Sequence, residues 1–173
     1  MFAYGSLLVE DAASGPVEHL AGHRRTWGVA TDNMRAIPGY KMYLRRSDGV
    51  RPAVYVAFVD IEPDPAGTVR GIVRTVSEAD LAELDLRERN YDRIEVTGAI
   101  EADFGGPVWT YRGSAEGRKR LRRGRAEGRA VISRDYLEKV AAGLTALGEH
   151  HEPDLPVWDL ERIDLPADPP PAR

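Results

Sequence analysis

The sequence predicts an α+β fold, built on a small mixed or antiparallel β-barrel with flanking helices. Short runs rich in β-branched and aromatic residues outnumber the helical segments, and they do not alternate with helices as parallel βαβ units do. Curling such a sheet into a barrel would also remove exposed strand edges. The clearest strand is 53–61 (AVYVAFVDI), and we expect the following segment 62–65 (EPDP) to end it.

Two stretches have helical periodicity. Ser77 is an N-cap candidate with acidic residues in the next turn, where they suit the helix dipole, so we expect a helix over 77–89. Ser133 is expected to cap a second helix, 134–147, with one apolar stripe. The segment 114–129 is interpreted as a charged connector, and 5–16 as a loop. Further strands are expected at 2–4, 25–31, 41–44, 69–76, 91–102 and 108–111.

The chain of 173 residues suits one domain of ordinary size. We place that domain at 1–149 and treat 150–173 as a C-terminal extension rich in proline and aspartate. Within the extension, 155–163 is expected to dock on the body of the protein. The Pro-rich end, 168–173, is expected to be disordered.

Composition excludes several classes of function. The chain has no cysteine, so disulfides, thiolate metal sites and cysteine nucleophiles are excluded. No apolar run approaches the roughly 18 residues that cross a bilayer, and a cytoplasmic location is expected. The formal net charge of −4 gives no overall field that would attract nucleic acid.

One carboxylate lies on the apolar face of the first helix. Glu88 follows Leu84 by four residues and Leu81 by seven, which puts the three on one face. Burial would raise the pKa of such a carboxyl toward the range useful for a general acid or base. The alternative is a structural ion pair with a nearby arginine, and Asp85, beside this face, is assigned to structure.

The segment Tyr4-Gly5-Ser6-Leu7 comes straight after the first strand. Glycine permits backbone conformations that other residues resist, and successive N–H groups in such a turn can bind an anion. The alternative is a turn that only reverses the chain.

Together these segments resemble the γ-glutamylcyclotransferase-like superfamily. The resemblance rests on three motifs in order, FAYGSLL, GIVRTVSEADLAELDLRERNYDRIEV and ISRDYLEKVAAGL. It implies a small mixed barrel with a cavity beside the N-terminal loop, and it requires neither cofactor nor metal. The positions that match the family's functional residues are Glu88 as the catalytic acid and base, and Tyr4, Gly5, Ser6, Leu7, Tyr91 and Tyr136 around the substrate. Some branches carry Asn where this chain has Leu7, so the substrate subtype stays open.

The resemblance also implies a reaction. The α-amine of a γ-glutamyl group attacks its own γ-carbonyl, releasing 5-oxoproline and an amine or amino acid. One carboxylate with a raised pKa can take the proton from the ammonium and deliver it to the leaving nitrogen. The leaving group is open between an amino acid, cysteinylglycine, a polyamine and a biosynthetic intermediate.

Two other classes of function are weighed. The first is a non-catalytic module that binds a small molecule with the same fold. The second uses the arginine run 118–125 to bind nucleic acid, but no aromatic residues are interleaved with it, so nucleic acid is not expected as a partner. His19 and His23 have a metal-ligand spacing, yet Gly22 favours a loop there and no third ligand is apparent.

Overall fold

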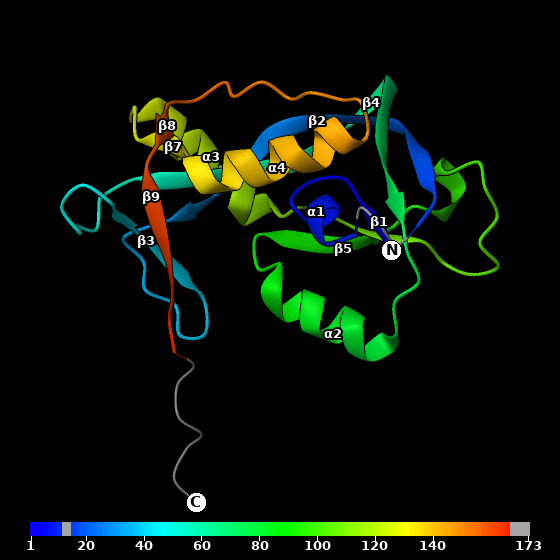
Figure 1. Ribbon diagram of the computed structural model, residues 1–173, viewed down its shortest axis with the longest axis horizontal. Coiled ribbons are helices and arrows are strands. Elements are labelled where there is room, and N and C mark those ends of the chain that lie inside the picture. Colours follow the sequence, from blue (N-terminus) through cyan, green and yellow to red (C-terminus); the bar gives the residue numbers. More distant parts are fainter. Residues whose placement is uncertain (12–14, 167–173) are drawn as a thin grey trace, which may run out of the picture.

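The computed structural model describes residues 1–11 and 15–166. Two long antiparallel strands, β2 (Val17–Asp32) and β4 (Tyr55–Val73), form the centre of the fold (Figure 1). The short strand β1 (Phe2–Ala3) pairs antiparallel with the end of β4. At the other end of β4, on the same edge as β1, β7 (Ala130–Ser133) runs parallel to the start of β4, and β8 (Val157–Trp158) runs parallel to β7. The sheet is therefore mixed.

Two further ribbons and four helices complete the described part of the chain. Strand β3 (Lys41–Arg45) pairs with β9 (Leu160–Asp164), and β5 (Tyr91–Glu95) pairs with β6 (Trp109–Gly113), both antiparallel. The sheet curls as a half-barrel, with helices packed around it (Figure 1). The predicted α+β class is thus confirmed. The helical elements are α1 (Leu7–Asp11), α2 (Glu78–Arg87), α3 (Ala115–Ala126), α4 (Arg134–Ala146) and a 3-10 turn (Thr97–Ala99).

A β-bulge beside the centre of the sheet accounts for part of its curl. The pairing shifts between Trp27 opposite Val59 and Val29 opposite Phe58, which leaves Gly28 as the extra residue. A Cβ atom at Gly28 would lie 2.5 Å from the Cβ of Asp60, so only glycine fits. Bulges bend the strand that carries them. This bulge lies opposite Val59, a residue that lines the candidate site.

The segment 62–65 does not end a strand as predicted. Strand β4 runs through both of its prolines, and Pro63 lies opposite His23. The register shifts between Ala21 and His23, where Gly22 has a φ of 72°. A proline is tolerated at such a bulge because the regular ladder of hydrogen bonds is already interrupted there. The same pairing places His19 and His23 in a strand and not in the expected loop.

The segment 114–129 is a helix for most of its length, so its interpretation as a connector was wrong. The Ser114 hydroxyl accepts a hydrogen bond from the N–H of Gly117 at 3.1 Å and caps α3. Leu121 is buried, and Gly124 lets the helix approach Tyr55, where an added Cβ would come within 2.7 Å of the Tyr55 Cβ and 2.9 Å of its ring. Arg118 donates two hydrogen bonds, at 2.9 and 2.8 Å, to the fully buried carboxylate of Asp60.

The two predicted helices are confirmed within two residues of their bounds. Ser77 caps α2 through a capping box with Asp80. Ser133 precedes α4, but its hydroxyl makes no cap and donates instead to the carbonyl of Leu160 at 3.3 Å. A short helix, α1, stands where a loop was expected.

The segment 155–163 docks on the body as predicted. It supplies β8 and most of β9, and Leu160 is completely buried. The predicted disorder of 168–173 lies outside the described residues. Among the described residues, none of the helices has the length and apolar character needed to span a bilayer.

Candidate functional site

The loop 4–7 is held in place from both ends. The carbonyl of Tyr4 accepts a hydrogen bond from Nε of Arg25 at 3.0 Å, and the Tyr4 hydroxyl donates to the carbonyl of Tyr111 at 2.6 Å. Arg25 is itself fixed, because its other nitrogens contact the carbonyl of Arg70 at 2.7 Å and the carboxylate of Glu149 at 2.6 Å. The loop is therefore a preformed part of the fold.

Helix α1 anchors the far end of the loop. The N–H of Leu8 donates to the carbonyl of Gly5 at 3.0 Å, and the Leu8 side chain is completely buried. It lies against Gly143 of α4, where an added Cβ would come within 2.7 Å of the Leu8 Cβ. In the described part of the chain, no acceptor takes a hydrogen bond from the N–H of Gly5, Ser6 or Leu7. These three donors are thus available to a ligand.

Glu88 marks the end of α2. It is the C-cap residue, its N–H donates to the carbonyl of Leu84 at 2.8 Å, and its carbonyl accepts from the N–H of Tyr91 at 2.9 Å. The side chain is 18% exposed, and one of its oxygens lies 3.3 Å from Nε of Arg87. Both alternatives raised by the sequence are therefore present: a largely buried carboxylate and a neighbouring arginine.

Two of the predicted tyrosines form hydrogen bonds to the backbone of the same residue of β4. The Tyr91 hydroxyl donates to the carbonyl of Val59 at 2.6 Å, and the N–H of Val59 donates to the Tyr136 hydroxyl at 3.2 Å. Burial raises the pKa of Tyr4, Tyr91 and Tyr136 well above the usual value, so all three stay neutral. The Tyr136 hydroxyl accepts in this contact, and it also hydrogen-bonds with the side chains of Ser6 and Tyr91.

All seven residues predicted from the sequence line one small cavity. Its volume is about 30 Å³, which is the space of a single water molecule. The structure thus brings together the loop after β1, the start of α1, the C-terminal end of α2, and residues of β5 and α4. The seven residues are Tyr4, Gly5, Ser6, Leu7, Glu88, Tyr91 and Tyr136.

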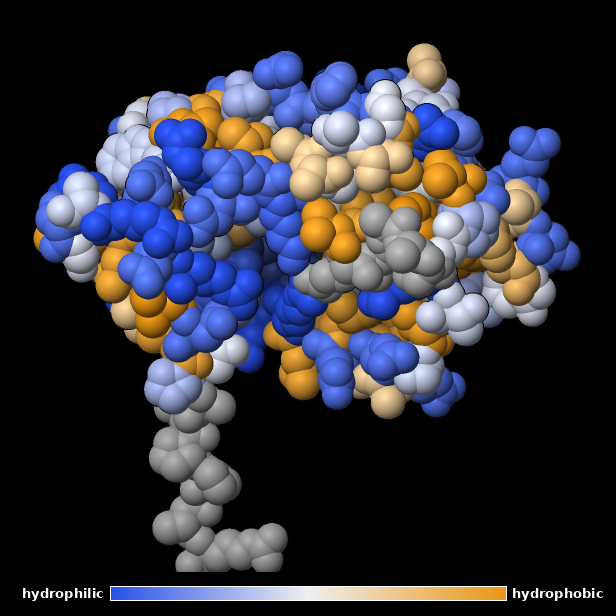
Figure 2. Space-filling view, viewed as in Figure 1, coloured by the Kyte–Doolittle hydropathy of each residue, from blue (hydrophilic) through white to orange (hydrophobic). Residues whose placement is uncertain are grey.

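A larger outer cleft of about 470 Å³ adjoins this inner cavity. Four residues line both spaces: Ser6, Glu88, Tyr91 and Tyr136. Figure 2 shows a hydrophilic hollow between the β3–β9 ribbon and the region of α2 and α4, the elements that supply half of the cleft's lining residues. The cleft therefore meets the small cavity along these four residues, and its size suits a small-molecule ligand.

The outer cleft contains a lysine that the sequence did not single out. Lys41, from β3, places its Nζ 4.2 Å from the ring centroid of Phe58 and 5.3 Å from that of Tyr40. Burial lowers the pKa of Lys41 to about 8, and Glu88 opposes that change. A single lysine in a short strand carries no signal of this role, because its position depends on the pairing of β3 with the distant β9.

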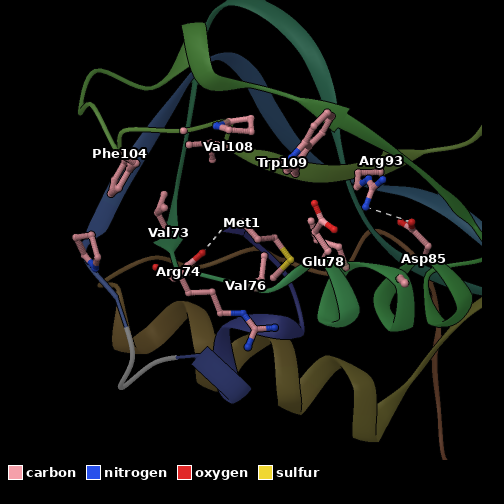
Figure 3. A pocket seen from close by; sticks show the side chains of 16 residues that line it. Met1, Val73, Arg74, Val76, Glu78, Asp85, Arg93, Phe104, Val108 and Trp109 are labelled. Atoms are coloured by element: carbon pink, nitrogen blue, oxygen red, sulfur yellow. Dashed lines mark hydrogen bonds and ion pairs between the residues drawn. The ribbon is translucent and has the colours of Figure 1, made fainter.

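A larger cavity lies elsewhere. It has a volume of about 750 Å³, includes other residues of α2, and contains none of the seven predicted residues (Figure 3). Asp85 pairs there with Arg93 at 3.2 Å, and the Arg93 guanidinium lies 5.2 Å from the ring centroid of Trp109. Among the described residues, no cluster of three or more His, Asp or Glu side chains could hold a metal ion in this cavity or any other.

Of the comparisons with known proteins, the one with family models agrees with the resemblance noted in the sequence. Comparison with curated proteins returned no match. A solved structure titled gamma-glutamyl cyclotransferase is similar to this chain at 15% sequence identity and a TM-score of 0.46, over 83% of this chain and 76% of that one. The family model "Gamma-glutamyl cyclotransferase, AIG2-like" matches residues 1–132, most of the length of the chain. The protein therefore belongs to the AIG2-like gamma-glutamyl cyclotransferase family.

Proposed function

We propose that the protein cyclises a γ-glutamyl substrate, releasing 5-oxoproline and an amine or amino acid. The observation that carries the proposal is the meeting of the Glu88 carboxylate with the loop 4–7 around one cavity, in a chain of this family. The site adjoins a cleft large enough for a substrate, so the two parts needed for binding and proton transfer lie together.

Glu88 is the proton carrier of the proposed reaction. At neutral pH the attacking α-amine is an ammonium, so it needs a base before it can form a bond to the γ-carbonyl carbon. Glu88 takes one proton from the ammonium before attack and a second from the same nitrogen after the new C–N bond forms, and it passes each in turn to the leaving nitrogen as the original amide C–N bond breaks. The attacking nitrogen thus goes from three protons to one, the leaving group departs as an ammonium, and atoms and charge balance without any other reactant. The attacking amine and the carbonyl belong to one molecule, so holding the substrate in a folded shape supplies much of the rate.

The loop 4–7 is the proposed holder of the γ-glutamyl group. Its three available N–H groups suit a carboxylate or the oxyanion that develops during attack. The inner cavity, at about 30 Å³, is too small for the whole group. The substrate therefore lies in the outer cleft and reaches the loop at Ser6, which lines both spaces.

The tyrosines shape the site in this proposal. The hydroxyls of Tyr4 and Tyr91 donate to backbone carbonyls, so they fix the wall between β4 and the loop. The neutral Tyr136 hydroxyl lies at the boundary between cavity and cleft, hydrogen-bonded with Ser6, and it can exchange that contact for one with the substrate.

The test is incubation of the full chain with a panel of γ-glutamyl amino acids, peptides and amines, followed by detection of 5-oxoproline. We expect at least one member to yield 5-oxoproline and the free amine in equal amounts. Binding of panel members without any 5-oxoproline would overturn the proposed activity and favour a non-catalytic binding module.

A further inference from the structure

The outer cleft is lined by many charges, and most of them pair within the protein. The Nη2 atom of Arg162 lies 2.6 Å from Oδ1 of Asp164, and Nε of Arg87 lies 3.3 Å from Oε1 of Glu88. Asp135 pairs with Arg46 at 2.5 Å. These contacts balance charge locally, so they leave little net attraction for a substrate.

Lys41 differs from these residues. Within residues 1–11 and 15–166, no carboxylate lies within 4.0 Å of its Nζ, and the ammonium makes no hydrogen bond to the protein. Its contacts are the faces of two aromatic rings, Tyr40 and Phe58, which also line the cleft. A cation removed from water costs free energy unless an anion or ring faces compensate it. The lowered pKa of Lys41 reflects that incomplete compensation.

The position of Lys41 indicates which part of a substrate it meets. The γ-glutamyl head is assigned to the loop 4–7, whose N–H groups are available for its carboxylate. Glu88 lies at the junction of cavity and cleft, where the scissile amide must sit. Lys41 lines only the outer cleft, beyond that junction, and is near enough to Glu88 for their charges to interact. It therefore faces the amine half of the substrate.

We propose that Lys41 binds an anionic group, most simply a carboxylate, on the amine that the substrate releases. This inference rests on the proposed function. It makes Lys41 a specificity-determining residue that favours γ-glutamyl derivatives of amino acids or peptides over those of uncharged or cationic amines. A charge-assisted hydrogen bond in a partly desolvated cleft supplies that discrimination.

The experiment compares γ-glutamyl-alanine with γ-glutamyl-alaninamide, which differ in the charge of the leaving amine. For the wild-type chain we expect kcat/KM to favour the acid by at least about tenfold, the effect of one hydrogen bond to a charged group. Lys41→Met removes the charge and keeps an unbranched apolar stem. The variant should lose the preference because KM for the acid rises, while kcat/KM for the amide should not change.

Lys119→Met is the matched control, because Lys119 is 72% exposed on α3 and its removal changes the net charge equally. This variant should keep the full preference. Persistence of the preference in Lys41→Met would overturn the inference. An equal loss on both substrates would also overturn it, because it would place Lys41 against the γ-glutamyl head or the reacting atoms.

Calorimetric binding of the same two compounds separates this inference from the proposed function. If neither compound yields 5-oxoproline, the proposed activity has failed on this pair, while the binding preference and its loss in Lys41→Met still test Lys41. Equal affinity of the wild-type chain for acid and amide would contradict the role of Lys41 even if both compounds were turned over.

Discussion

Helix α2 contributes two carboxylates, three residues apart, to two different cavities. Asp85 borders the cavity of about 750 Å³ and pairs with Arg93 at 3.2 Å. Its carboxylate also accepts a hydrogen bond at 2.7 Å from the hydroxyl of Tyr111, a residue that lines the small cavity. Glu88 borders the small inner cavity and the outer cleft. The Asp85 side chain is 42% exposed and the Glu88 side chain 18%.

This difference shows that the volume of a cavity does not by itself identify the reactive site. Asp85 uses both carboxylate oxygens in contacts with its own protein, so its role is to tie α2 to β5 and β6. Glu88 sits where a helix ends, beside a loop with available N–H groups and a cleft open to ligand. The convergence of such groups in a smaller space is the better indicator of a site.

The largest difference in turnover is expected when a bulky side chain is placed in each cavity in turn. Ser6→Phe places a ring at the junction of inner cavity and cleft, and we expect at least about a 10²-fold loss of 5-oxoproline formation because the substrate is displaced. Ala82→Phe places the same ring at the larger cavity, and turnover should stay within about twofold, as for an ordinary surface change. Steady-state rates of both variants check this. A large loss in Ala82→Phe alone would move the site to the larger cavity.

Rates measured over a series of pH values test the role proposed for Lys41 in the outer cleft. The pKa of Lys41 is lowered by burial to about 8, with Glu88 and Asp164 opposing the change and Arg162 and Arg87 adding to it. Lys41 is charged below that pH and neutral above it, so anion binding should be complete below about pH 8 and lost as pH rises through it.

The readout is the ratio of kcat/KM for γ-glutamyl-alanine to that for γ-glutamyl-alaninamide, because titration of Glu88 and of the attacking amine largely cancels in it. We expect the ratio to fall several-fold between about pH 7 and about pH 9.5, the interval that spans this pKa. In Lys41→Met the ratio should be flat. A wild-type ratio that is independent of pH would contradict the assignment.

The smallest effect is expected at the other carboxylate. Asp85→Asn keeps an oxygen for the Tyr111 hydroxyl and removes only the partly exposed pair with Arg93. The free energy of unfolding should fall by no more than about 1 kcal/mol, the range for exposed ion pairs. Urea denaturation measures this, and turnover of the same variant should stay within about threefold. A loss of turnover comparable to that from a missing general base would give Asp85 a role in the reaction.

The parts of the fold that the sequence predicted well depend on local signals. Ser77 and Asp80 form a capping box that fixes where α2 begins, and the spacing of Leu84 and Glu88 follows from the helix alone. The inner cavity was predictable in outline because its residues lie in three recognisable motifs. The sequence could not predict that these residues meet at Val59, because their meeting depends on the bulge at Gly28 and on long-range strand pairing.

The arginine run shows where local interpretation failed. Its charge suggested a solvated connector, yet Arg118 contacts buried Asp60 and Arg120 donates to the side chain of Asn90 at 2.9 Å. The spacing of Gly117, Leu121 and Gly124 matches one face of a helix, and Ser114 precedes it as a cap, so the signal was present. The role of Lys41 left no comparable pattern, since β9 reaches it from the far end of the chain.

The central claim is that Glu88 carries the proton, and one comparison of rates tests it most directly. Glu88→Gln keeps the size and much of the hydrogen bonding of the side chain but removes the base. With the best γ-glutamyl substrate of the panel, the variant should fold, bind that compound with similar affinity, and form 5-oxoproline at least about 10²-fold more slowly than the wild-type chain, the lower range for general acid–base catalysis. A Glu88→Gln rate equal to that of the wild-type chain would contradict the account.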